Sequence, residues 1–380
     1  MPMHAGTAVP PVRPVPAGRA QRAVRSLLLV LAMLAALVGV SLPAAGAAHA
    51  AVPDRWGFAY LDNPTPPPGY VPDTTRQWGS WPSPAANPVK VDQIGTGSYV
   101  VHFPLIAGPG GIAHVTAVGR TGSWCQVRGW STAGTGQDVS VGCHRPGGAP
   151  EDTRFTVLYT TSSGVPSPAV GGYGYVYANS TGAVIGQYNS AGGTNTVGYG
   201  GTGTWKAWLP GLGQPTPAGN IEVTAVDAVN GARCKVAEWA PSAGGQTVVV
   251  TCFNAFGAPY DTRWTLSYAE KRAVHGAALP PKSYGYLWFN GGVPAGTNFN
   301  SSGGVNTLAG SVPYNVNLPN IAVPSDTAQV TAFGGGPDYC GLATPWARSA
   351  GTANLYPLCF NGSSGSPVAS RFLTAYTSAF

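Results

Sequence analysis

The chain has 380 residues, a formal net charge of +6 and only 9% charged residues. Four of its 20 basic residues lie in residues 1–50, which leaves 16 against 14 acidic residues in the remainder. This near balance provides no basic surface for nucleic acid or for an anionic membrane, so neither is an expected partner. Glycine and proline are abundant, but regularly spaced valine and aromatic residues favour a buried core over disorder.

Residues 1–50 have the features of a secretory signal peptide. Arginines precede an apolar run over residues 27–40, and Ala48-His49-Ala50 follows as a small-x-small cleavage pattern. An uncleaved membrane anchor is the alternative, but the run is shorter than the roughly 20 residues that span a bilayer. We therefore expect a secreted, extracellular protein with no membrane contact after the signal is cleaved.

The remaining sequence contains three copies of one unit. The two cysteines of each copy are 18, 18 and 19 residues apart, and a Val-Thr-Ala segment begins at residues 115, 223 and 330. Each copy also starts with an aromatic-Gly-aromatic segment and ends with Arg-aromatic-x-x-x-Tyr. Fixed spacing of this kind indicates a repeat architecture. The predicted organisation is a signal peptide (1–50), a first unit (51–160), a linker (161–172), a second unit (173–269), a linker (270–283) and a third unit (284–380).

The residue pattern inside each unit predicts β-strands. Short runs rich in valine, threonine and aromatic residues alternate with clusters of glycine, proline, asparagine and serine. No helical period of useful length follows the signal peptide. A unit of about 100 residues with roughly seven strands is large enough for a sandwich with its own core. The expected fold class is all-β, with three tandem antiparallel β-sandwich domains of immunoglobulin-like or jelly-roll-like type.

The cysteines are predicted to form one disulfide within each unit. When residues 234–252 are folded back about their midpoint, Cys234 faces Cys252 and Val236 faces Val250. Facing residues of an antiparallel pair are close enough for a disulfide, and export favours oxidation. Zinc is the alternative, but the spacing and histidines of a zinc site are missing. The predicted pairs are Cys125–Cys143, Cys234–Cys252 and Cys340–Cys359.

Residues 362–367 read Gly-Ser-Ser-Gly-Ser-Pro, which resembles the sequence around the nucleophile of trypsin-like serine proteases. Ser364 would be that nucleophile. However, the equivalent turns of the first two units have no serine at this place, and the third unit has no histidine to serve as a base. We interpret the segment as a turn between strands and predict no catalytic residue.

No cofactor or metal site is expected from the remaining motifs. Asp152 and Asp261 occupy equivalent Asp-x-Arg positions, which favours a local turn interaction. The asparagine-rich segments at 188–197 and 299–308 lack the carboxylates that a calcium loop needs. The sequence also has no phosphate loop, dinucleotide fingerprint or His-Glu-x-x-His motif.

Three tryptophans are the candidate ligand-binding residues. Strand alternation places Trp208 on the solvent face, and Trp130 and Trp239 follow their cysteines by five residues, on the face opposite the core or on a bend. Exposed rings of this kind stack on the apolar face of a sugar. Burial of these rings by a linker or a neighbouring unit is the alternative. The candidate partner is a polysaccharide or a cell-surface component.

The complete repeat resembles that of uncharacterised exported repeat proteins of GC-rich Gram-positive bacteria, a resemblance that covers residues 56–378 and implies no activity. The sequence therefore predicts a secreted, non-enzymatic protein with a binding or structural role at or outside the cell surface. The alternative is carbohydrate recognition through exposed tryptophan, with an unrecognised hydrolase activity as an addition to it.

Overall fold

The computed structural model describes residues 55–161, 171–213, 216, 218–276, 283–293 and 297–380. The predicted signal peptide, most of the first predicted linker and residues 277–282 of the second lie outside these residues. The described start of the second linker is packed, since His275 is buried and its ring lies 3.9 Å from that of Trp56. Within the described ranges, no helix is long and apolar enough to cross a membrane.

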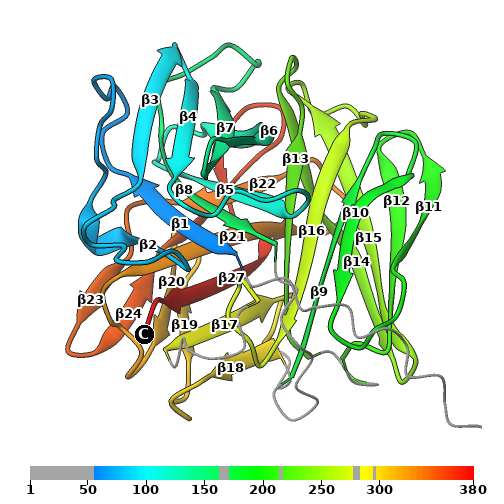
Figure 1. Cartoon of the computed structure of the whole chain (residues 1–380). Helices are drawn as coiled ribbons and strands as arrows, with labels where there is room; N and C mark the ends of the chain where they lie inside the picture. The colour runs from blue at the N-terminus through cyan, green and yellow to red at the C-terminus, as the bar shows by residue number, and fades with distance from the viewer. Residues whose placement is uncertain (1–54, 162–170, 214–215, 217, 277–282, 294–296) are drawn as a thin grey trace, which may run out of the picture. The chain divides into compact units, whose positions relative to one another are not determined.

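The structure is built almost entirely of β-strands, as predicted (Figure 1). The first unit forms a 3-10 helix, η1 (Thr74–Arg76), and the strands β1 (Trp56–Leu61), β2 (Gln77–Gly79), β3 (Lys90–Gly95), β4 (Ser98–Phe103), β5 (Ile112–Val118), β6 (Trp124–Ala133), β7 (Gly136–His144) and β8 (Arg154–Thr160). The second unit forms β9 (Gly172–Ala178), β10 (Val184–Asn189), β11 (Thr196–Gly201), β12 (Thr204–Pro210), β13 (Asn220–Val226), β14 (Ala232–Ser242), β15 (Gly245–Asn254) and β16 (Arg263–Glu270).

The third unit repeats this order with shorter, interrupted strands. They are β17 (Tyr284–Phe289), β18 (Asn298–Asn300), β19 (Thr307–Gly310), β20 (Tyr314–Leu318), β21 (Asp326–Phe333), β22 (Tyr339–Leu342), β23 (Ala347–Ser349), β24 (Thr352–Leu355), β25 (Pro357–Phe360), β26 (Pro367–Val368) and β27 (Arg371–Ser378). In every unit, four strands form a first layer and the strands around the cysteine hairpin form a second, which we call the hairpin layer.

Each unit is a sandwich with its own core. In the first unit the layer β2-β1-β8-β5 faces the layer β6-β7-β4-β3, and one buried cluster that includes Tyr99, Val127 and Phe155 lies between them. Separate clusters fill the second and third units. The apolar alternation of the strands thus buries one main cluster in each unit, and each cluster also includes residues of a neighbouring unit, such as Val226, Trp288 and Val118.

The units nevertheless share their sheets. The hairpin layer of the first unit continues into the first layer of the second, that of the second into the third, and part of that of the third into the first. Figure 1 shows the first of these joints, where β6 lies beside β13. Each joint is a short parallel contact, and the paired residues are Val127 with Val226, Val236 with Phe333, and Leu342 with Val118.

This sharing closes a cycle of three units. The expected three tandem domains are therefore not found as separate bodies, because residues 51–380 form one compact unit. The central strands of the cycle are β5, β13 and β21, which carry the Val-Thr-Ala segments and contact one another. Every residue of these three strands is buried. We call the line around which they meet the axis.

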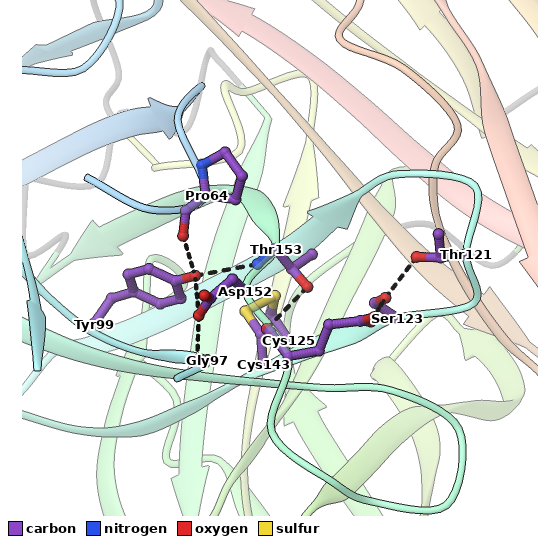
Figure 2. Close-up of a disulfide and its surroundings, with 10 residues drawn as sticks. Pro64, Gly97, Tyr99, Thr121, Ser123, Cys125, Cys143, Asp152 and Thr153 are labelled. Carbon is purple, nitrogen blue, oxygen red and sulfur yellow. Dashed lines mark hydrogen bonds between the residues drawn. A yellow bond between two sulfur atoms is a disulfide. The ribbon is translucent and has the colours of Figure 1, made fainter. Parts of the chain in front are cut away.

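The three predicted disulfides are confirmed. Cys125 bonds to Cys143, Cys234 to Cys252 and Cys340 to Cys359, and each pair is directly opposite in its hairpin. Three disulfides are typical of a protein in an oxidising, extracellular environment. Figure 2 shows the first of them beside Asp152, which accepts hydrogen bonds from the Gly97 amide at 2.7 Å and the Tyr99 hydroxyl at 3.5 Å. Asp152 therefore ties its turn to the β3–β4 hairpin more than 50 residues away, which differs from the local interaction expected from the sequence.

Candidate functional site

The three units present one equivalent row of residues on the outer face of the hairpin layer. Each row crosses four neighbouring strands, so that its side chains lie side by side. The rows are Lys90, His102, Asp138 and Ser131 in the first unit, Thr196, Trp208, Thr247 and Ala240 in the second, and Thr307, Asn317, Asn354 and Ala347 in the third. The scaffold is repeated, but the chemistry on this face is different in each unit.

In the second unit the row presents a half-buried tryptophan on an open surface. Trp208 lies on β12, between the exposed Thr196 of β11 and the half-buried Thr247 of β15. Gly198 lies two residues after Thr196 on β11 and therefore on the same face of the sheet. It has no side chain, and a Cβ atom built there would meet nothing within 4 Å. At the other end, Gly245 packs under the ring, since an added Cβ would lie 3.0 Å from the Trp208 Cη2 atom. The far end of the ring therefore lies against the Gly244-Gly245 turn, and the residue stays partly exposed.

In the first unit the same position holds a histidine between two carboxylates. His102 Nδ1 lies 2.8 Å from Asp138 Oδ1, and its Nε2 lies 3.1 Å from Asp92 Oδ2. The Gly69 amide also donates to Asp92, and this hydrogen bond lowers the pKa of that carboxyl. Both ring nitrogens are engaged, so the arrangement differs from a triad in which a histidine nitrogen faces a nucleophile. A hollow of about 410 Å³ lies beside it.

In the third unit the row is polar and uncharged. Asn317 donates to Thr307 at 3.1 Å, and Asn354 is the residue opposite it on β24. A shallow hollow of about 430 Å³ is lined by these residues and their neighbours. Amides and hydroxyls of this kind supply hydrogen bonds to a polar ligand but no ring on which a sugar could stack.

The expected exposure of Trp239 is corrected by the structure. A β-bulge between Val236 and Glu238 inserts one residue into β14, which reverses the alternation of side chains beyond it. Trp239 consequently faces Val248 and points into the core, where only 8% of it is exposed. Its ring lies 5.0 Å from that of Trp288 in the third unit, so it joins two units together.

An equivalent bulge changes the direction of Trp130 in the first unit. A bulge between Val127 and Gly129 places it opposite the buried Val139. Its indole nitrogen donates to the Gly110 carbonyl at 2.9 Å, and its ring lies 4.7 Å from that of Tyr177 in the second unit. The neighbouring unit therefore contacts this ring and covers part of it, while Trp130 stays half-buried like Trp208. Of the three candidate tryptophans, Trp208 alone faces outward from its sheet.

Ser364 lies in a hydrogen-bonded turn. The Asn361 side-chain oxygen accepts from the Ser363 amide, the Ser364 amide and the Ser364 hydroxyl at 3.0–3.3 Å. The Ser364 hydroxyl in turn accepts from the Ser366 amide. The hydroxyl is thus part of ordinary turn chemistry.

The equivalent turns of the three units meet one another near the axis. Gly148 of the first turn lies against Ala255 of the second, and Gly257 of the second lies against Gly362 of the third. Gly365 of the third turn lies against Pro146 of the first, so that an added Cβ would be 2.1 Å from Pro146 Cγ. This closeness requires glycine, and it explains the glycine-rich character of the segment around Ser364.

A cyclic set of hydrogen bonds surrounds the axis among the central strands. The threonine of each Val-Thr-Ala segment bonds to the residue that precedes the same segment in another unit. The three contacts are Thr116 to Gln329 at 2.7 Å, Thr224 with His114 at 3.0 Å, and Thr331 to Glu222 at 2.7 Å. All six residues are buried.

The ionisable members of this set have altered acidity. Burial raises the pKa of Glu222 to about 7, although hydrogen bonds from Thr331 and Asn220 favour its ionised form. Burial also lowers the pKa of His114 to about 3, so its ring stays neutral between Thr224 and Ser267. A neutral ring suits a site where both neighbours are hydroxyls.

The sequence interpretation missed this axial set. Its signal is present once the units are aligned, since a polar residue, His114, Glu222 or Gln329, precedes each Val-Thr-Ala segment. A second equivalent position precedes the first cysteine of each unit and holds Trp124, Arg233 or Tyr339. Arg233 stacks between the other two, with its guanidinium carbon 4.5 Å from the Trp124 ring centre and 4.3 Å from that of Tyr339.

Within the described ranges, no group of three or more histidine, cysteine, aspartate or glutamate residues has an arrangement that could hold a metal ion. Comparison of the chain with family models, with curated proteins and with solved structures found no match. The candidate site is therefore interpreted from its own geometry.

Proposed function

We propose that this chain is an exported, non-enzymatic binding protein that recognises a polysaccharide through the outer face of the second unit. The observation that carries the proposal is Trp208, a half-buried ring fixed on a flat sheet surface beside the open position Gly198. A supported ring with free space next to it suits the apolar face of a pyranose. The flanking Thr196 and Thr247 provide hydroxyls for the rim of the sugar.

Export is part of the proposal. It is supported by the amino-terminal signal pattern and by three disulfides, which an oxidising compartment maintains. The closed cycle of sheets provides the rigidity that a preorganised surface needs, because an ordered binding face loses less entropy on association. On this account the first and third units hold the second unit in shape.

The proposal is tested by screening the purified protein on a glycan array and measuring the affinity for the glycan that binds. Trp208→Ala should weaken binding roughly tenfold to more than a hundredfold, the value of losing about 1–3 kcal/mol of buried aromatic contact.

The matched controls are His102→Ala and Asn317→Ala, which alter the equivalent positions of the sister units. Both should retain the affinity of the unmodified protein. Equal affinity of Trp208→Ala and the unmodified protein, or the absence of binding to every glycan, would contradict the proposed function.

A further inference from the structure

A small cavity lies on the axis beside the three disulfides. Its volume is about 50 Å³, which is several times the space that one water molecule needs. Its walls repeat three times, since each unit supplies its Val-Thr-Ala segment, its first cysteine and the residue before that cysteine. The residue before the cysteine differs between the walls and is Trp124, Arg233 or Tyr339, and the second unit adds Ala232.

Arg233 places a buried positive charge at this cavity. Only 6% of the residue is exposed, and its guanidinium lies between two aromatic rings. Its Nη2 donates to the carbonyls of Asn254 and Gly362, at 3.2 and 2.8 Å. Its Nε and Nη1 atoms have no hydrogen-bond partner of ordinary geometry among the described residues, although the nearby Tyr339 hydroxyl favours the charged guanidinium. No carboxylate of the described ranges forms an ion pair with it.

The other polar groups that we describe at the cavity are either hydrogen-bond donors, like Arg233, or already hydrogen-bonded to other residues. The Trp124 indole nitrogen is buried and has no hydrogen-bond partner among the described residues. The hydroxyls of Thr116 and Thr331 each donate to a side chain further along the axis and accept from a valine amide. The cavity therefore offers unused N–H groups and a positive charge. An uncompensated buried charge is costly, and an anion would offset it.

We propose that this axial cavity binds one small monovalent anion of the size of chloride or bromide, held by the Arg233 guanidinium and the Trp124 indole N–H. The volume excludes a large organic ligand, and a single guanidinium matches one negative charge. Arg233, Trp124 and Tyr339 come from three different units, so the bound anion would tie the closed cycle together at its centre.

The first test is crystallographic. Crystals of the protein grown in sodium bromide should give one anomalous peak in the cavity, within hydrogen-bond range of Arg233 and Trp124. A cavity that contains only ordered water, with no anomalous peak, would overturn the proposal.

The second test measures the site in solution. Chloride added at constant ionic strength should raise the Tm of the protein, because a ligand that binds the folded state stabilises it. In Arg233→Met the chloride dependence should shift to concentrations at least about tenfold higher, since the charged donor is lost. An equal chloride response in both proteins would contradict the assignment.

Arg76→Met is the matched control. Arg76 also stacks on a tryptophan, with its guanidinium 4.5 Å from the Trp346 ring centre, but it has a carboxylate partner in Asp73 at 3.3 Å. This variant should keep the bromide peak and the chloride response. If Arg233→Met does not fold, Trp124→Phe keeps an aromatic ring, although a smaller one, and removes the N–H donor. It should weaken the chloride response severalfold, and an unchanged response would count against the site.

Discussion

Glu222 shows how a single buried residue makes stability depend on pH. Its ordinary pKa of 4.5 is raised to about 7 by burial in the axial set. A carboxyl whose folded pKa is raised takes up protons on folding, so its contribution to stability falls as pH rises between these two values. The depressed pKa of His114 acts in the opposite direction, and its contribution is lost as pH falls from about 6.5 to about 3.

Glu222→Gln should remove the first of these effects. The equivalent residue of the third unit is Gln329, so the amide suits this position, and the unpaired Asn220 side-chain oxygen offers it an acceptor. Relative to the unmodified protein, the free energy of unfolding should rise as pH increases from about 4.5 to about 7. Above about pH 7 the difference between the two proteins should stay constant, at about 3 kcal/mol more than at pH 4.

Urea unfolding at a series of pH values measures the free energy of unfolding of both proteins. Because His114 is present in both, its contribution cancels in the difference, which then reports Glu222 alone. Glu238→Gln is the control, because Glu238 is exposed on the hairpin layer of the same unit. A difference that does not change with pH would show that the burial of Glu222 is not what governs its titration.

The hairpin strands show what one inserted residue does to a binding surface. The symmetric cysteine spacing predicts the register of β14 and β15 correctly as far as Val236, and the disulfide follows from it. The bulge after Val236 has no sequence signature that alternation alone detects, and it turns Trp239 inward. Of the two candidate tryptophans in the second unit, Trp208 alone remains on the outer face of the sheet.

Trp239→Ala should consequently act on stability. The side chain is buried against Trp288 and Tyr268, and its indole nitrogen donates to Gln246. Loss of a buried tryptophan costs about 3–5 kcal/mol, so the midpoint of urea unfolding should fall accordingly. Trp208→Ala, on the outer face of the same layer, should cost less than half as much. Equal losses from the two variants would show that the bulge does not separate their environments.

The assembly of the units is the part of the fold that the sequence pattern does not predict. Strand alternation and turns predict an all-β sandwich for each copy, and each copy does close its own core. The joints between units depend on short parallel contacts, such as that of Val127 with Val226. These contacts do not alter the alternation of apolar and polar residues along either strand. A free sandwich and a member of a closed cycle therefore have the same local pattern.

The axial residues escape prediction for the same reason. Glu222 and Thr331 are separated by more than a hundred residues and meet only because the cycle closes. In an isolated sandwich, each would appear to be a polar residue on the solvent face of a strand. Their burial, and the cavity beside Arg233, exist only in the assembled molecule.

Calorimetric unfolding of the intact protein tests the closed cycle most directly. Every unit contributes a hairpin layer to the sheet of another, so no unit can unfold without exposing the edge of its neighbour. We predict a single transition whose calorimetric enthalpy equals its van't Hoff enthalpy, which is the signature of one cooperative body. Two or three resolved transitions, each with the enthalpy of a domain of about 100 residues, would contradict the account and restore three independent sandwiches.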